Sequence, residues 1–215
     1  MKTLDLHKIR KQLMKALDSK RYEHTQGVAY TSAALAMRYG EDVQKAELAG
    51  LLHDCAKCLD NDKKIQICKK HDIEISEAEQ NNPFLLHAKV GGFLAKSKYK
   101  IDDEEIIDAI LYHTTGRPGM SLLEKIVYIA DYIEPGRNHA PNLGEIRELC
   151  FADLDEALLK ILEDILVHLR ESKKEIDPMT QMTYEFYKRK RIQKEVSICN
   201  IMYQKIIHLI FTIPC

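Results

Sequence analysis

The chain has 215 residues, of which 45% are hydrophobic, so it is long enough for one compact domain with a single core. Its 32 Lys and Arg residues are balanced by 33 Asp and Glu residues, which gives a formal net charge of -1. This balance excludes the global basic field that wraps nucleic acid, so any anionic substrate must be captured locally.

The first residues, Met1 to Lys8, alternate charged and apolar side chains without a continuous apolar stretch, so they do not resemble a secretory signal. We therefore expect a cytoplasmic protein whose six cysteines stay reduced, because a chain of this size needs no disulfides. Cys55 and Cys58 have the spacing of half a zinc ribbon, but no second pair has that spacing. Two thiols buried in a helix are the favoured interpretation.

Apolar residues recur at helical spacing along nearly the whole chain, and no stretch alternates strictly, so the expected fold class is all-α, a compact helical bundle. Gly40, Gly116 and the pair Pro135-Gly136 mark helix ends. The pattern predicts helices at 6–17, 31–39, 41–58, 84–96, 103–114, 122–134 and 153–169, a loop at 139–144 and a further short helix from 177–178.

Residues 1–190 are expected to form this domain, and residues 191–215 an apolar, helical C-terminal tail. Asn200, Gln204, Lys205 and His208 interrupt the tail, so it is a poor candidate for a membrane-spanning helix. We expect it to dock on the domain or on a second subunit of a homodimer. A helix on a membrane surface is the alternative, but the tail has few basic residues for that role.

His53 and Asp54 stand side by side in an apolar helical stretch, residues 46–57. Burying them without partners would cost several kcal/mol, so each needs a partner. The same dipeptide recurs at His71-Asp72 among charged neighbours, where a solvated helix end or turn is expected. Asp131 poses the same burial problem within a helix that is apolar on most faces, and a cation would satisfy it.

Three further histidines are expected on separate helices that one core could bring together. Each alone is more often a hydrogen-bonded core residue than a metal ligand. The full candidate set is four imidazoles and two carboxylates: His24, His53, Asp54, His87, His113 and Asp131. Such donors suit iron, manganese or zinc, and six exceed what one tetrahedral structural site uses. The set therefore favours a paired-metal hydrolytic centre.

The order of these residues, with Gly-Leu-Leu-His-Asp-x-x-Lys at 50–57 as its centre, resembles the HD-domain metal-dependent phosphohydrolases. Within them, the stretches at 86–91, 112–118 and 130–137 are similar to the YqeK-type bacterial symmetrical diadenosine tetraphosphatases. The resemblance covers about residues 5 to 190. It implies a helical fold, a dinuclear site usually described with iron, and hydrolysis of the acid anhydride in diadenosine tetraphosphate to give two ADP molecules.

In that arrangement one divalent ion would be held by His24, His53 and Asp131, the other by His87 and His113, and Asp54 would bridge them. A metal-bridging hydroxide would attack phosphorus in line while the ions take up the developing charge. The two ions outweigh the two carboxylates and the hydroxide by one positive charge, so the site would attract a polyphosphate.

Lys57 follows Asp54 by three residues and would share its helix face, so it is expected to act in catalysis by supporting the leaving phosphate. A solvated helix charge is the alternative. Further substrate contacts are expected from side chains near the ligands or in a stretch that encloses the nucleotide in the family: Arg21, Thr114, Arg117, Arg137 and Thr180. A surface ion pair is the alternative for Arg117 and Arg137, and Asp177 stands where the family is expected to have histidine.

The expected substrate is a dinucleoside polyphosphate or another nucleotide. The same site would also serve an HD-domain nucleotidase or nucleoside triphosphate hydrolase, and product analysis separates these, because only symmetrical cleavage gives ADP without AMP or phosphate. A rival of another class is a nucleotide-sensing module that binds metal and ligand without turnover. Against it, the full ligand set plus Lys57 is more than binding requires.

Overall fold

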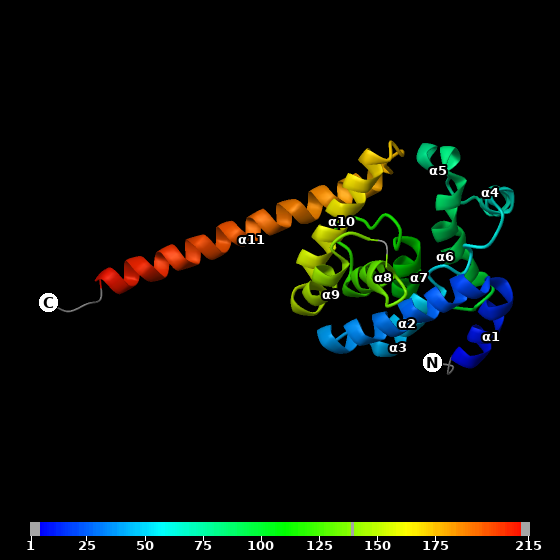
Figure 1. The fold of residues 1–215 in the computed structure, drawn as a ribbon, viewed down its shortest axis with the longest axis horizontal. Helices are drawn as coiled ribbons and strands as arrows, with labels where there is room; N and C mark the ends of the chain where they lie inside the picture. Colours follow the sequence, from blue (N-terminus) through cyan, green and yellow to red (C-terminus); the bar gives the residue numbers. More distant parts are fainter. Residues whose placement is uncertain (1–4, 139, 212–215) are drawn as a thin grey trace.

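The structure is a computed structural model that describes residues 5–138 and 140–211, with side chains described through residue 197. Every regular element in these ranges is a helix, which confirms the all-α fold class (Figure 1). In chain order they are α1 (Leu6–Ala16), α2 (Ser19–Tyr39), α3 (Val43–Leu52), α4 (Asn61–Lys70), α5 (Glu77–Asn81), the short 3-10 helix η1 (Pro83–Leu86), α6 (His87–Ser97), α7 (Glu104–Leu111), α8 (Leu122–Ile133), α9 (Leu143–Ala152), α10 (Leu154–Glu171) and α11 (Pro178–Phe211).

The core lies where α2, α3, α7 and α8 pack against one another, with α10 on the other side of α8. Fully buried aliphatic side chains from these helices fill it, among them Leu35, Leu51, Ile110 and Ile126. Their apolar faces point inward because the apolar residues recur at helical spacing. Polar residues near the ends of these buried helix faces therefore meet at one edge of the core.

α2 begins at Ser19, well before residue 31, where the predicted helix starts. Asp18 caps it, because its carboxylate accepts a hydrogen bond from Arg21 N at 2.8 Å. The helix ends as expected at Gly40, whose φ of 76° is left-handed and carries no penalty for glycine. The added turns matter for the site, because they place Arg21 and His24 on a rigid helix.

α3 ends at Leu52, so the prediction of one helix over residues 41–58 is wrong at its C-terminal end. After Leu52 the chain forms turns: Cys55 N donates to Leu52 O at 3.0 Å, and Lys57 N donates to Asp54 O at 2.9 Å. These bonds span three residues rather than four. His53 and Asp54 lie at the start of these turns, and both side chains face the same centre.

The sequence pattern does not predict α4, α5 or α9, and α9 begins inside the expected loop at 139–144. α9 buries Leu143, Ile146 and Cys150 at helical spacing, but it starts within the turn formers at 139–144. α4 and α5 are short and largely polar, and each buries only a narrow strip, such as Lys64 and Cys68 in α4. So narrow a strip gives little of the apolar periodicity on which the prediction rests.

Exposure to solvent tests two predictions, one about the thiols of Cys55 and Cys58 and one about His71-Asp72. Cys55 is buried, but the turns after α3 bring Cys58 to the surface, so the prediction of two buried thiols is wrong for Cys58. His71 and Asp72 are exposed at the end of α4, which confirms the expected solvated helix end.

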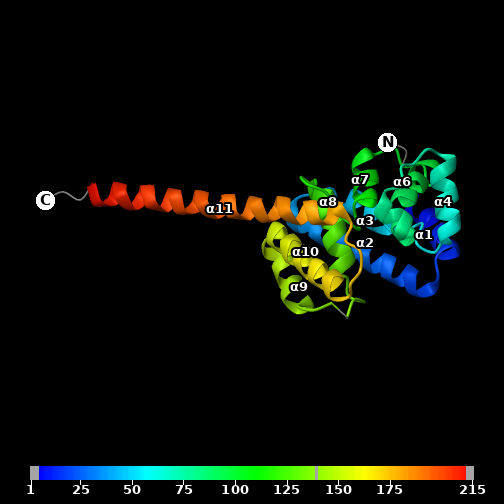
Figure 2. The same ribbon diagram turned by 90° about the horizontal axis from the view of Figure 1, so that it is seen from above.

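α11 is one helix of 34 residues rather than the predicted short one. Its first part packs on α10, with Thr183 and Tyr187 buried and Lys190 Nζ 2.8 Å from Asp155 Oδ2. Figures 1 and 2 show the rest projecting away from the other helices. No helix among the described residues is long and apolar enough to cross a membrane. The helix continues through residue 190, so the division between 1–190 and 191–215 stays a prediction, and residues 212–215 lie outside the described part.

Candidate metal centre

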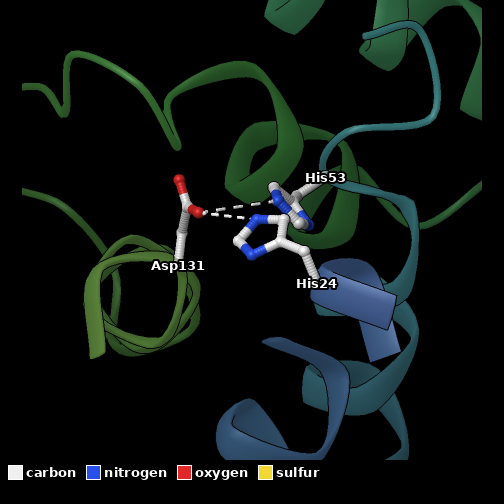
Figure 3. A group of neighbouring side chains, drawn as sticks. All are labelled: His24, His53 and Asp131. Carbon is white, nitrogen blue, oxygen red and sulfur yellow. Dashed lines mark ion pairs between the residues drawn. The ribbon is translucent and has the colours of Figure 1, made fainter. Parts of the chain in front are cut away.

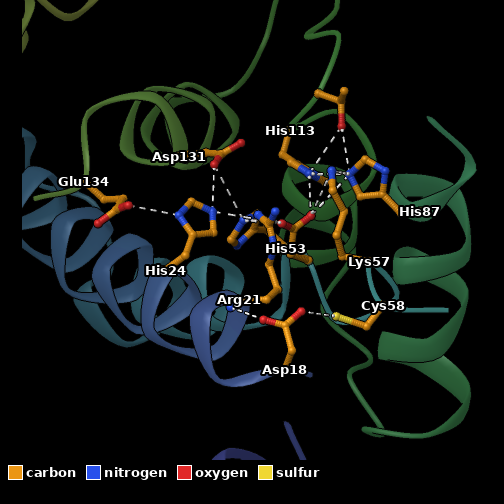
Figure 4. Close-up of polar contacts among 12 residues, drawn as sticks. Asp18, Arg21, His24, His53, Lys57, Cys58, His87, His113, Asp131 and Glu134 are labelled. Atoms are coloured by element: carbon orange, nitrogen blue, oxygen red, sulfur yellow. Dashed lines mark hydrogen bonds and ion pairs between the residues drawn. The ribbon is translucent and has the colours of Figure 1, made fainter. Parts of the chain in front are cut away.

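Five segments of the chain bring the six candidate ligands together, and Figures 3 and 4 show five of these side chains. They come from α2 (His24), from the turn after α3 (His53 and Asp54), from the first residue of α6 (His87), from the residues after α7 (His113) and from α8 (Asp131). Segments far apart in the sequence thus meet at one edge of the core.

The first group of candidate ligands consists of Asp131 and the two imidazoles of His24 and His53, which face its carboxylate in Figure 3. Asp131 Oδ1 lies 3.0 Å from His24 Nε2 and 3.8 Å from His53 Nε2. Because these three atoms come from three elements and converge within the size of one coordination sphere, they form a candidate position for a metal ion.

Asp54 lies between this group and the other two histidines. Its Oδ2 is 3.5 Å from His53 Nε2 and 4.0 Å from His24 Nε2. Its Oδ1 is 3.2 Å from His87 Nε2 and 3.5 Å from His113 Nε2. One carboxylate therefore faces two sets of imidazole nitrogens, one with each oxygen.

The histidines outside α2 all present the same nitrogen to this centre. The Nδ1 atoms of His53, His87 and His113 donate to the backbone carbonyls of Gly50, Phe84 and Ile110 at 2.6, 2.7 and 2.7 Å. A carbonyl can only accept, so Nδ1 carries the proton and Nε2 presents a lone pair. Yet His87 Nε2 and His113 Nε2 lie only 3.2 Å apart. Two facing lone pairs repel unless a cation lies with them.

Several of these buried atoms have no hydrogen-bond partner. They are His24 Nε2, His53 Nε2 and Asp54 Oδ1, all aimed into the centre. Leaving buried polar atoms unsatisfied costs about 1–3 kcal/mol each, and native structures seldom do so. Borderline divalent cations accept imidazole and carboxylate donors, so the residues present fit a metal centre.

The charges at the centre are set by burial and by neighbours. Burial alone raises the pKa of a carboxyl, but three neighbouring histidines, led by His53, hold the pKa of Asp54 well below its usual value. Burial also opposes charge on Asp131, yet the His24 imidazole 3.0 Å from its Oδ1 keeps that pKa low. Burial lowers the pKa of His87 to about 4, against the pull of the Asp54 carboxylate. At neutral pH both carboxylates are charged, and His87 is neutral as a ligand must be.

The centre opens into a cleft of about 900 Å³, a size typical of small-molecule sites. α2 forms one wall, and α8 with the residues after it forms the other. Three of the predicted substrate contacts, Arg21, Thr114 and Arg137, line it. The cleft therefore joins the candidate ligands to groups that can bind an anion.

Four of the predicted contacts lie beside the ligands themselves. Arg21 Nη1 is 2.8 Å from Asp54 Oδ2, and Arg137 Nη2 is 2.7 Å from Asp131 Oδ1. Lys57 Nζ is 3.1 Å from His87 Nε2 and 3.8 Å from Asp54 Oδ1 (Figure 4). The fourth is the hydroxyl of Thr114, 3.3 Å from His113 Nε2. Lys57 reaches the centre from the turn after α3 and not, as expected, from a helix face.

Arg117 and Thr180 do not lie at the centre, and neither lines the cleft. Arg117 Nε lies 2.7 Å from Glu124 Oε1, its Nη2 lies 2.9 Å from Asp108 Oδ2, and its guanidinium stacks on Tyr112. This is the ion pair that the sequence left open as the alternative. Thr180 is buried in the first turn of α11.

Glu134 is a residue of the centre that the sequence did not single out. It is buried, and its Oε1 accepts a hydrogen bond from His24 Nδ1 at 3.0 Å (Figure 4). The only signal in the sequence is indirect: a ligand histidine in mid-helix needs an acceptor for its second ring nitrogen. No spacing links residues 24 and 134, because the two come from different helices.

Comparison with known proteins agrees with this geometry. A family model described as HD domain matches residues 21–136. The chain is 42% identical over 170 residues to a symmetrical bis(5'-nucleosyl)-tetraphosphatase of Bacillus subtilis, covering 79% of this chain and 90% of that one. It is 42% identical to the enzyme of the same name from Halalkalibacterium halodurans, covering 80% and 92%.

A solved structure shows the same likeness in three dimensions. It is the crystal structure of a protein from Clostridium acetobutylicum described as a predicted HD superfamily hydrolase involved in NAD metabolism. It superposes with a TM-score of 0.84 at 42% sequence identity, covering 86% of this chain and 98% of that one. With a family model matched over more than half of its length and such relatives covered almost completely, the chain is a hydrolase that belongs to the HD domain family.

Proposed function

We propose that this chain is a metal-dependent phosphohydrolase that cleaves diadenosine tetraphosphate symmetrically into two ADP molecules. The proposal is carried by one observation: buried imidazole nitrogens and carboxylate oxygens from five segments converge with no hydrogen-bond partner on several of them. The relatives named symmetrical bis(5'-nucleosyl)-tetraphosphatase support the substrate. The cleft of about 900 Å³ beside the centre has room for a nucleotide.

The two ions share Asp54 in this proposal. His24, His53 and Asp131 would hold one ion together with Asp54, and His87 and His113 would hold the other together with Asp54. Two divalent ions supply Lewis-acid charge to the phosphate oxygens and lower the pKa of water for attack on phosphorus. Iron is the ion that the resemblance implies, and manganese and zinc suit the same donors.

Arg21 and Arg137 bind and orient the polyphosphate. Each guanidinium gives one Nη to a ligand carboxylate, Asp54 or Asp131, and lines the cleft with its remaining donors. A guanidinium has five N–H donors in a planar fork, so the free edge can take two phosphate oxygens. The arginines therefore tie the position of the substrate to the position of the ligands.

Lys57 stabilises the leaving phosphate. Its ammonium lies 3.1 Å from His87 Nε2, at the end of the centre opposite Asp131, and its side chain is about one-third exposed. A fixed positive charge at that point offsets the charge that develops on the departing oxygen. Thr114, beside His113, offers a neutral donor on the same side.

The chain contains a matched pair of variants for the test. Asp54→Asn removes the central carboxylate, and Asp72→Asn makes the same change in the exposed His-Asp pair at the end of α4. Asparagine suits position 72, where φ is 54°. The variants and the wild type are loaded with metal and incubated with diadenosine tetraphosphate, and products are separated by chromatography.

We expect ADP alone from the wild type and from Asp72→Asn. Asp54→Asn should lose more than about 100-fold in kcat/KM, because even outer-shell changes at metal sites cost roughly 10–100-fold. Undiminished activity of Asp54→Asn would refute the proposal. AMP or inorganic phosphate among the products would favour an HD-domain nucleotidase or nucleoside triphosphate hydrolase. Metal binding without turnover would favour the nucleotide-sensing module.

A further inference from the structure

His24 differs from the other three histidines in the acceptor of its Nδ1 proton. The other three lie at or just beyond helix ends, where carbonyls of the preceding turn lack helical partners and can accept from Nδ1. His24 lies within α2, where the carbonyls of the preceding turn are occupied by the helix. Its Nδ1 instead donates to Glu134 Oε1, from another helix, at 3.0 Å.

The surroundings of Glu134 are shaped to hold its carboxylate there. Its Oε2 accepts a hydrogen bond from Gly136 N at 2.6 Å. A Cβ at Gly27 would lie 2.5 Å from the same oxygen, so the missing side chain on α2 makes the space for it. Arg147 donates to the backbone carbonyl of Glu134 at 2.9 Å and fixes the turn.

The carboxylate also changes the balance of charge around the centre. On the side of His24, the carboxylates of Asp131 and Glu134 are balanced by Arg137 and Arg21. On the side of His87 and His113, where Asp54 is shared, Lys57 leaves a net positive charge. Glu134 therefore adds one negative charge to the side of His24.

We infer that Glu134 is a positioning residue that strengthens one of the two metal positions through His24. It fixes His24 with the proton on Nδ1 and strengthens the hold of the His24-His53-Asp131 position on its ion. A carboxylate acceptor raises the basicity of the opposite ring nitrogen more than a carbonyl does, and such partners are worth roughly 10–100-fold in metal affinity. The inference rests on the proposed metal centre and adds the order in which the two positions bind metal. The His24-His53-Asp131 position binds its ion first and releases it last.

Titration of the metal-free, full-length protein with Co²⁺ tests the inference without any measurement of activity. Calorimetry and visible absorption follow the binding steps. We expect two steps for the wild type, separated by about 10–100-fold in affinity. Glu134→Gln should lose about 10–100-fold in affinity at the tighter step and leave the weaker step unchanged. Glu124→Gln is the matched control, because Glu124 is a similarly buried carboxylate, in the first turn of α8, that pairs with Arg117 away from the cleft.

Gly27→Ala is a second, independent variant. The new Cβ would displace the carboxylate of Glu134 while leaving its charge in the chain, and alanine suits a helix interior. We expect the same loss of affinity at the tighter step. Circular dichroism shows whether each variant folds. If Glu134→Gln does not fold, Gly27→Ala tests the role of the Glu134 carboxylate in its place.

The outcomes separate the inference from the proposed function. A tighter step of wild-type affinity in both variants would overturn the inference and leave the metal centre intact. An equal loss at both steps, in the variants but not in Glu124→Gln, would show a merely structural role and would also overturn it. If the wild type binds no Co²⁺, the proposed function itself fails.

Discussion

At the scale of single residues, burial rather than residue type decides which His-Asp pair can act. His53 and Asp54 are almost fully buried, whereas His71 and Asp72 are exposed. Buried ionisable groups need a partner, and the apolar sequence around 46–57 is enough to predict the burial. The partners of the outer ring nitrogens could not be predicted, because they depend on helix ends and on Glu134, which come together only in the fold.

Protonation of His87 should make the metal-free protein lose stability in acid. Burial lowers its pKa from 6.5 to about 4, so between these values the unfolded chain binds a proton that the folded chain does not. Stability is therefore fully present above about pH 6.5 and falls as pH drops towards about 4. Urea unfolding across this range measures the loss.

The comparison with His71 isolates this effect. His87→Gln should flatten the decline in unfolding free energy between pH 6.5 and 4, whereas His71→Gln, at an exposed position, should leave the curve unchanged. Parallel curves for the wild type and His87→Gln would show that burial of His87 does not govern acid stability.

At the scale of helices, the close contact of α2 with α3 holds His24 and His53 in register. Gly50 on α3 makes this contact: a Cβ there would meet Ser32 Oγ at 2.8 Å, Ala29 Cα at 2.9 Å and Val28 O at 3.0 Å. Two of these atoms are backbone, so α2 and α3 would have to move apart.

Gly50→Ala should therefore destabilise the protein by about 1–3 kcal/mol, as overpacking of a close contact does. Gly144→Ala is the control, because a Cβ at that helical glycine meets nothing within 4 Å. It should be neutral or stabilising by up to about 1 kcal/mol. Urea unfolding midpoints compare the two. Equal midpoints for Gly50→Ala and the wild type would mean that the helices tolerate a wider spacing.

The same scale shows where prediction from the sequence succeeds. For helices with a broad buried face, such as α8 and α10, the bounds predicted from the sequence are close to the observed ones. The N-terminal half of α2 is missed, because its partners at the centre, Asp54, Asp131 and Glu134, are distant in the chain. α9 is missed although it packs mainly on α10, the next helix. Arg117 could equally have been a phosphate ligand on sequence grounds. Its pairing with Glu124 depends on how the turn before α8 folds back.

At the scale of the whole molecule, α11 divides into a packed part and a projecting part. Thr180, Thr183 and Tyr187 are buried against the domain, and Lys194 Nζ still reaches Asp153 Oδ2 at 2.9 Å. Beyond this point the helix extends away from the other elements (Figure 2). The sequence from 198 to 211 is mostly apolar, and no helix among the described residues qualifies as a membrane span.

A single helix without tertiary contacts is marginal in water, and apolar surface favours burial. We therefore expect the full chain to form a homodimer through residues 198–211 and a chain ending at residue 197 to be a monomer, as measured by light scattering. The shortened chain keeps the contacts of α11 with α10, so its Co²⁺ binding should equal that of the full chain. Monomers of equal solubility in both cases would show that the projecting part is not an interface, and loss of Co²⁺ binding on shortening would show that dimerisation supports the centre.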